Sequence, residues 1–180
     1  MSRKVKLLNN LLACLATQRS LNTNGIYFKV RASETDRILM HRTGLMLAAE
    51  AGLASIAQDF LHLEANIHIN DEYGNSAAML AARNGNDDIL KTLLGLGAKK
   101  NEQTGSGATA LTWAVRNLHV NTVTTLLGEH ADPNLAEKSG QTAIYYAANL
   151  GSIGIINSLL QHGADPNKKT KTGWTALYTA

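Results

Sequence analysis

Cysteine and proline are scarce in this sequence of 180 residues, which holds one Cys and two Pro. The lone Cys14 excludes an intrachain disulfide framework and is typical of a protein from a reducing compartment. No apolar run approaches the roughly 18 residues that a membrane-spanning helix needs, so no such helix is predicted. The formal net charge of +3 is too small to indicate a nucleic-acid or membrane partner by itself.

Groups of residues that carry chemistry are missing as well. The six histidines are scattered, with no pair four residues apart and no cysteine at ligand spacing, so no metal site is expected. The Gly-Ser-Gly at 105–107 lacks the Lys-Ser or Lys-Thr that follows in a phosphate-binding loop. We therefore predict no catalytic residue and no cofactor, and we interpret the chain as a non-enzyme.

What the sequence does have is an internal repeat. A Ser or Thr recurs at one constant interval, at Thr43, Ser76, Thr109, Thr142 and Thr175. Small pairs follow it at Ala48/Ala49, Ala81/Ala82, Ala114/Val115 and Ala147/Ala148, and then apolar pairs at Phe60/Leu61, Leu93/Leu94, Leu126/Leu127 and Leu159/Leu160. A fixed period of this length indicates a stacked array of similar units rather than one globular core.

Each unit has the pattern of two helices and a turn. The hydroxyl residue is suited to cap the first helix, because its oxygen can accept a hydrogen bond from a free amide of the first turn. The small pair lets that helix approach its neighbours closely, and the apolar pair lies on the buried stripe of the second helix. His130 stands in a column where glycine usually follows the second helix, as at Gly97 and Gly163. We expect a left-handed backbone there, with strain of about 1 kcal/mol.

These motifs carry a family resemblance. The pattern Gly-x-Thr-Ala-Leu-x-x-Ala-Ala, the Leu-Leu pair and Gly-Ala-Asp-Pro-Asn, all recurring with the same constant period, resemble the ankyrin repeat. The resemblance covers residues 43–180 and implies an all-α repeat solenoid of helix-turn-helix units joined by short β-hairpin loops. Its units lie near 41–73, 74–106, 107–139, 140–172 and, as a partial fifth, 173–180.

One departure from the family pattern concerns the rigidity of each unit. The family's His is replaced by Met46, Met79, Thr112, Tyr145 and Tyr178. The side-chain bridge that the family forms between its Thr and this His is therefore expected to be missing.

Residues 1–42 do not follow the repeat. Val5, Leu8, Leu11, Leu12 and Leu15 share one helical face, which predicts a helical cap over the first unit. The alternative is a signal peptide, since the basic start is followed by an apolar run and by Leu-Leu-Ala-Cys. Asn9 and Asn10 interrupt that run and favour the cap.

The resemblance implies recognition of a protein partner through the hairpin tips and the exposed side of the first helices. The residues at these positions that we expect to bind are Tyr73, Arg83, Asn84, Trp113, Arg116, Asn117, Tyr146, Asn149 and Trp174. Aromatic residues and arginine dominate interface energetics. Two alternatives stay open: Trp113 and Tyr146 stack on each other as core residues, or the arginines pair with Glu50 or Glu72.

The sequence thus predicts a monomeric, cytoplasmic scaffold that binds one protein on its concave face and binds neither nucleic acid nor membrane. Because the sequence stops within the first helix of a fifth unit, an alternative is the targeting module of a longer enzyme. Such an architecture also resembles ankyrin-bearing effectors that intracellular bacteria deliver into host cells. Nucleic-acid binding through the basic segment at 168–171 is a third hypothesis.

Overall fold

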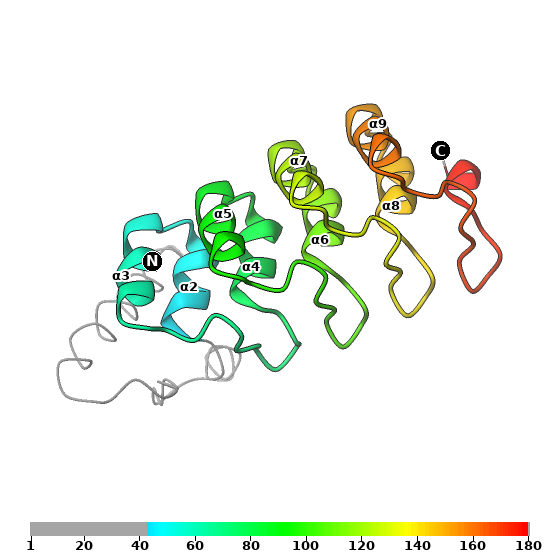
Figure 1. Ribbon diagram of the computed structural model, residues 1–180. Helices are drawn as coiled ribbons and strands as arrows, with labels where there is room; N and C mark the ends of the chain where they lie inside the picture. Colours follow the sequence, from blue (N-terminus) through cyan, green and yellow to red (C-terminus); the bar gives the residue numbers. More distant parts are fainter. Residues whose placement is uncertain (1–42, 180) are drawn as a thin grey trace, which may run out of the picture.

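The computed structural model describes residues 43–179, which form a row of helix pairs (Figure 1). The first helices are α2 (Gly44–Ala51), α4 (Ala77–Asn84), α6 (Ala110–Arg116) and α8 (Ala143–Asn149). The second helices are α3 (Ala54–His62), α5 (Asp87–Gly95), α7 (Val120–Gly128) and α9 (Ile153–Gln161), and the 3-10 helix η3 (Ala176–Thr179) follows. The predicted all-α repeat solenoid is confirmed. The cap predicted for 1–42, including Cys14, lies outside the described residues.

Hydroxyl side chains start most of the first helices as the repeat predicts. The amides of Met46 and Met79 donate to Thr43 Oγ1 (3.2 Å) and Ser76 Oγ (3.4 Å), respectively. Thr142 is different, because it has the extended backbone of an N-cap but its hydroxyl accepts no bond from the first turn of α8. The hydroxyl cap is therefore not required for a first helix to begin at this position of the repeat.

In α6 a threonine replaces the family's histidine without loss of a bridge. The Thr112 amide donates to Thr109 Oγ1 (3.2 Å), and the Thr109 amide donates to Thr112 Oγ1 (2.7 Å). This reciprocal pair is a capping box, which satisfies two amides that the helix start leaves free. The expected loss of the Thr–His bridge is thus offset in this unit.

The core runs through the whole array along the first helices. The small pairs that begin at Ala48, Ala81, Ala114 and Ala147 are buried, and successive first helices from α2 to α8 contact one another. Small side chains allow this close approach of helix backbones. In the second helices Phe60, Leu93, Leu126 and Leu159 are buried as predicted.

The second members of the apolar pairs are less uniform. Leu127 is buried, Leu61 and Leu94 are partly buried, and Leu160 is 42% exposed. The prediction that both members lie on the buried stripe is therefore wrong for Leu160. Within residues 43–179 no second helix follows α9 to cover the exposed part of this side chain.

The loops between helix pairs project from one side of the array and repeat one hydrogen-bond pattern (Figure 1). In successive loops the amides of Thr104, Glu137 and Thr170 donate to the carbonyls of Ala108, Gln141 and Trp174, at 2.8 to 2.9 Å. Neighbouring loops are also joined, since the Lys138 amide donates to the Ser106 carbonyl (2.8 Å). This contact requires close approach: a Cβ on Gly140 would lie 2.8 Å from Thr170 Cα. The loops therefore form one continuous, ordered edge.

Three residues other than glycine have a left-handed backbone in the described part of the chain. They are Glu64 (φ 57°), Leu118 (φ 58°) and His130 (φ 60°). The prediction for His130 is confirmed, whereas Glu64 and Leu118 were not predicted. Each occupies a position where most other units have glycine, which adopts this conformation without steric cost.

Removing the Cβ at His130 is expected to stabilise the protein. The exposed side chain contributes little packing, so His130→Gly should raise the free energy of unfolding in urea by about 0.5–1 kcal/mol. The matched control His130→Ala keeps the Cβ and should give no such gain. Equal stabilities of the two variants would contradict the strain.

Candidate functional site

Two arginines and two aromatic rings alternate along the first helices. The Arg83 Cζ, from α4, lies 5.0 Å from the centre of the Trp113 ring on α6. The Arg116 Cζ lies 5.0 Å from the Trp113 ring and 5.0 Å from the Tyr146 ring on α8. At these distances a guanidinium is attracted to the ring face by about 0.5–1 kcal/mol per contact at exposed sites. We call Arg83, Trp113, Arg116 and Tyr146 the arginine–aromatic row.

The repeat explains why these four side chains meet. Arg116 lies one period after Arg83, and Tyr146 lies one period after Trp113. Stacking of the units therefore sets Trp113 between Arg83 and Arg116, and Arg116 between the two rings. The alternative in which Trp113 and Tyr146 stack directly on each other is not what is found, because Arg116 contacts both rings.

The rings of the row are anchored in the core, whereas part of the row is exposed to solvent. Trp113 and Tyr146 are partly buried and pack against the hydrophobic core. The Arg116 side chain is 40% exposed. Anchored rings beside the half-buried Arg83 and the exposed Arg116 form a surface that a partner can contact with little loss of side-chain entropy.

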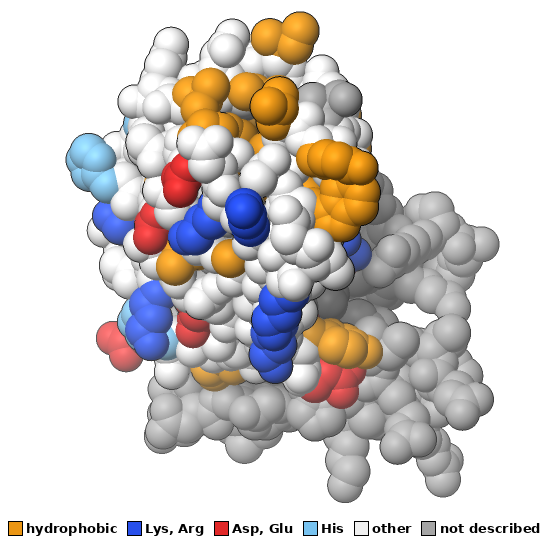
Figure 2. All heavy atoms as spheres, turned by 90° about the vertical axis from the view of Figure 1, so that its right-hand side faces the viewer, with side chains coloured by type: hydrophobic (Ala, Val, Ile, Leu, Met, Phe, Trp, Pro, Cys, Tyr) orange, Lys and Arg blue, Asp and Glu red, His pale blue; other side chains and the backbone are white. Residues whose placement is uncertain are grey.

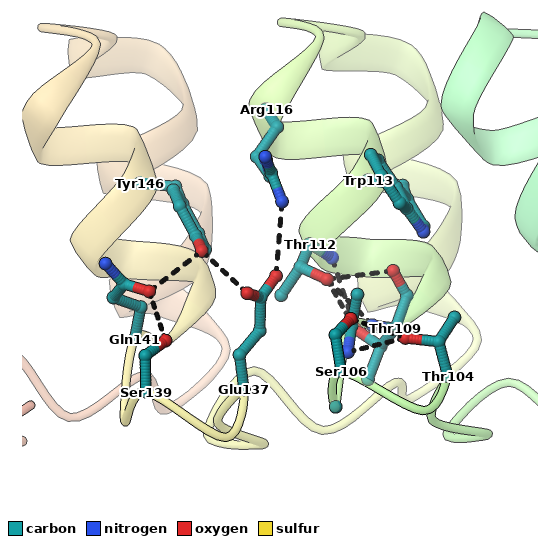
Figure 3. A network of polar contacts seen from close by, with 12 residues as sticks. Thr104, Ser106, Thr109, Thr112, Trp113, Arg116, Glu137, Ser139, Gln141 and Tyr146 are labelled. Atoms are coloured by element: carbon teal, nitrogen blue, oxygen red, sulfur yellow. Dashed lines mark hydrogen bonds and ion pairs between the residues drawn. The ribbon is translucent and has the colours of Figure 1, made fainter. Parts of the chain in front are cut away.

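Glu137 fixes the end of the row at Tyr146 (Figure 3). Its Oε1 lies 3.4 Å from a terminal nitrogen of Arg116, and its Oε2 accepts a hydrogen bond from the Tyr146 hydroxyl (2.8 Å). Gln141 Oε1 lies 3.1 Å from the same hydroxyl and also accepts from the Ser139 hydroxyl. The Glu137 side chain is 10% exposed, so the ion pair is partly shielded from water. Arg116 pairs with Glu137 rather than with Glu50 or Glu72.

These surroundings change the acidity of Tyr146. Burial raises the pKa of the Tyr146 phenol, and the hydrogen bond to Glu137 and the charge of that carboxylate raise it further, to about 12. The Arg116 charge acts in the opposite direction and lowers this pKa. Tyr146 therefore stays neutral and keeps donating to Glu137 well above physiological pH.

Three of the other predicted residues are asparagines near the ends of first helices. The Asn84 Nδ2 donates to the Leu80 carbonyl (2.9 Å), and the Asn117 Nδ2 donates to the Trp113 carbonyl (2.8 Å). These amides satisfy helix carbonyls, which leaves their oxygens available at the surface. Asn149 is exposed at the end of α8.

The two remaining predicted residues lie apart from the row. Tyr73 is 54% exposed on a loop tip, and its amide donates to Asp71 Oδ1 (3.0 Å). Trp174 is 40% exposed and lies against Tyr178, with ring centres 3.7 Å apart. Within residues 43–179 the cation–π contacts of Arg83 and Arg116 involve Trp113 and Tyr146 and not these two rings.

Trp174 belongs to the C-terminal end of the array. Figure 2 looks at this end and shows hydrophobic side chains gathered over its upper part. The exposed apolar residues of α9 and of the last described segment are Ile153, Leu160, Trp174, Leu177 and Tyr178. The structure thus divides the predicted site into the row and this separate end.

Sequence reasoning missed the polar partners of the row. Glu137 shares a loop position with Asp71, Thr104 and Thr170, each one period from the next. This column of polar residues was a usable signal, because loop side chains at one position of the repeat point toward the same place in every unit. The contacts of Gln141 and Ser139 had no comparable signal.

Residues 43–179 hold neither a cluster of metal-ligating side chains nor a membrane-spanning helix. No three side chains of His, Cys, Asp or Glu gather there as they would around a metal ion. No helix in that range has the length and apolar composition needed to cross a bilayer.

The array and its loops define a repeat solenoid, and comparison with known proteins identifies its family. A family model described as ankyrin repeats (3 copies) matches residues 45–137 and 119–180. This protein belongs to the ankyrin-repeat family. No curated protein matches the chain significantly. Ankyrin repeats are generally non-catalytic modules for protein–protein interaction.

The hydrogen bond from Tyr146 to Glu137 should be visible in a pH titration. The difference in absorbance at 295 nm between the unchanged protein and Tyr146→Phe should show one phenol ionising near pH 12. In a Glu137→Gln background the midpoint should fall but stay above 10.0, because burial persists. A midpoint near 10.0 in the unchanged protein would contradict the network.

The same shift predicts how stability depends on pH. The folded-state pKa of Tyr146 lies above the unfolded value of 10.0, so its contribution is complete below pH 10 and is lost as the pH rises toward 12. Urea denaturation should therefore show the stability difference between the unchanged protein and Tyr146→Phe shrinking over this range.

Proposed function

We propose that this protein is a monomeric scaffold that binds one partner protein through the arginine–aromatic row. The observation that carries the proposal is the alternation of two guanidiniums and two rings across three successive helix pairs. Tyr, Trp and Arg are the residue types most often found at the energetic centre of interfaces. The family's general role supports a protein as the partner.

The position of the row favours contact with a folded surface or an extended segment. Its residues come from α4, α6 and α8, so a partner can span three units. The adjoining edge of loops is held by hydrogen bonds between neighbouring loops. A loop backbone held in this way loses little conformational entropy on binding, which lowers the entropic cost of association.

Affinity capture from cell lysates, read by mass spectrometry, tests the proposal. The row variant Arg83→Gln/Trp113→Leu/Arg116→Gln should lose a specific partner by about tenfold or more, because it removes three interface anchors. Leu is chosen because Leu80 and Leu47 occupy the equivalent buried position in earlier units. Circular dichroism must show that the variant is folded.

A control matched in charge separates the row from general electrostatics. Lys91→Gln/Lys99→Gln also removes two positive charges, but at exposed positions of α5 and of the turn after it. Capture should be retained by this control. Equal capture by all three proteins, or equal loss in both variants, would contradict binding through the row.

A further inference from the structure

The two ends of the arginine–aromatic row differ in whether their hydrogen-bond donors have an acceptor. At one end Glu137 supplies both oxygens of its carboxylate, one to Arg116 and one to Tyr146. One repeat earlier the corresponding donors are Arg83 and Trp113. The contacts of Glu137 with Arg116 and Tyr146 therefore show where an acceptor for Arg83 and Trp113 would lie one repeat earlier.

The residue equivalent to Glu137 is Thr104, one period earlier. Thr104 has no carboxylate, and its hydroxyl is already engaged within the loop. Its Oγ1 accepts from the Ala108 amide (3.0 Å) and lies 2.9 Å from Ser106 Oγ. It therefore supplies no acceptor to Arg83 or Trp113.

Both donors at this end lack an acceptor among the described residues. The Trp113 Nε1 is buried and has no hydrogen-bond partner. The Arg83 guanidinium makes neither a hydrogen bond nor an ion pair with any side chain or carbonyl between residues 43 and 179. A buried donor without an acceptor destabilises the structure, because it has lost its hydrogen bond to water and gained none in return. Figure 3 shows the indole nitrogen pointing down toward the loop that carries Thr104, as the Tyr146 hydroxyl points toward the loop of Glu137.

The exposed charges at the tips of the two loops that follow Thr104 are positive, namely Lys138 and Lys171, whereas the loop before it carries Asp71 and Glu72. Together with Arg83 these lysines favour an acidic segment lying along the loops.

We propose that Arg83 and Trp113 bind a carboxylate from an acidic peptide segment of the partner protein, an Asp or Glu side chain that takes the place Glu137 has one repeat later. This inference rests on the proposed function, because it concerns the same row. The Trp113 Nε1 is covered in the unbound chain, so nearby side chains shift as the carboxylate enters. Rotamer changes of this kind are common at interfaces.

A first test supplies the missing carboxylate from within the chain. Thr104→Glu should place it between Arg83 and Trp113, and the loop accepts Glu because Glu137 makes the same backbone bonds. Its melting temperature should exceed that of Thr104→Gln by about 2 °C. The gain should vanish in an Arg83→Gln background. Equal melting temperatures of the Glu and Gln variants would overturn the proposal.

A second test measures binding with a displayed library of random linear peptides, selected on the unchanged protein. The enriched peptides should share an Asp or Glu. Replacing that residue by its amide, or using Thr104→Glu as the target, should weaken binding about tenfold, since a charge-assisted pair of hydrogen bonds is lost or blocked. Thr104→Gln should bind almost normally.

The outcomes separate this inference from the proposed function. In one outcome the enriched peptides share no acidic residue, fail to bind the row variant and still bind Thr104→Glu. This result would overturn the carboxylate site and leave the row as the binding surface. Peptides that bind the row variant unchanged, or no enriched peptide at all, would contradict both.

Discussion

The structure depends on one constraint: a single helix pair has too little apolar surface to fold alone and must bury its first helix against the next. The buried small pairs allow this close stacking, and the loops follow with a hydrogen-bonded edge. Stacking at a constant period then fixes every other contact between units. Side chains one period apart occupy equivalent places in their units. A different residue type at one repeat position therefore changes the surface of that unit at a known place.

The candidate site is a direct product of that register. Arg116 meets Trp113 because the two residues lie three positions apart on α6, and it meets Tyr146 because α8 stacks on α6. The same register brings Glu137 to Arg116 and Thr104 to the Arg83 position. Function in such an array therefore arises where neighbouring units differ, and the unsatisfied donors near Thr104 mark one such difference.

The sequence predicted the features that are determined by a residue's position in the repeat. The helix pairs and the left-handed His130 both follow from column positions. It did not predict that Thr142 accepts no capping bond, or that the Trp113 N–H has no partner. These depend on side-chain rotamers and on the distance between elements, which a pattern of residue types does not contain. Separation of Trp174 from the row also required the three-dimensional arrangement.

The most direct test of the arginine–aromatic row uses the two tryptophans of the chain, Trp113 and Trp174. Each gives one indole N–H signal in a nitrogen–proton correlation spectrum, and Trp113→Leu assigns them. On addition of a captured partner protein, the account predicts that the Trp113 signal moves downfield as its N–H gains an acceptor, while the Trp174 signal stays in place. A shift of Trp174 with Trp113 unchanged would contradict it and would move the binding surface to the C-terminal end.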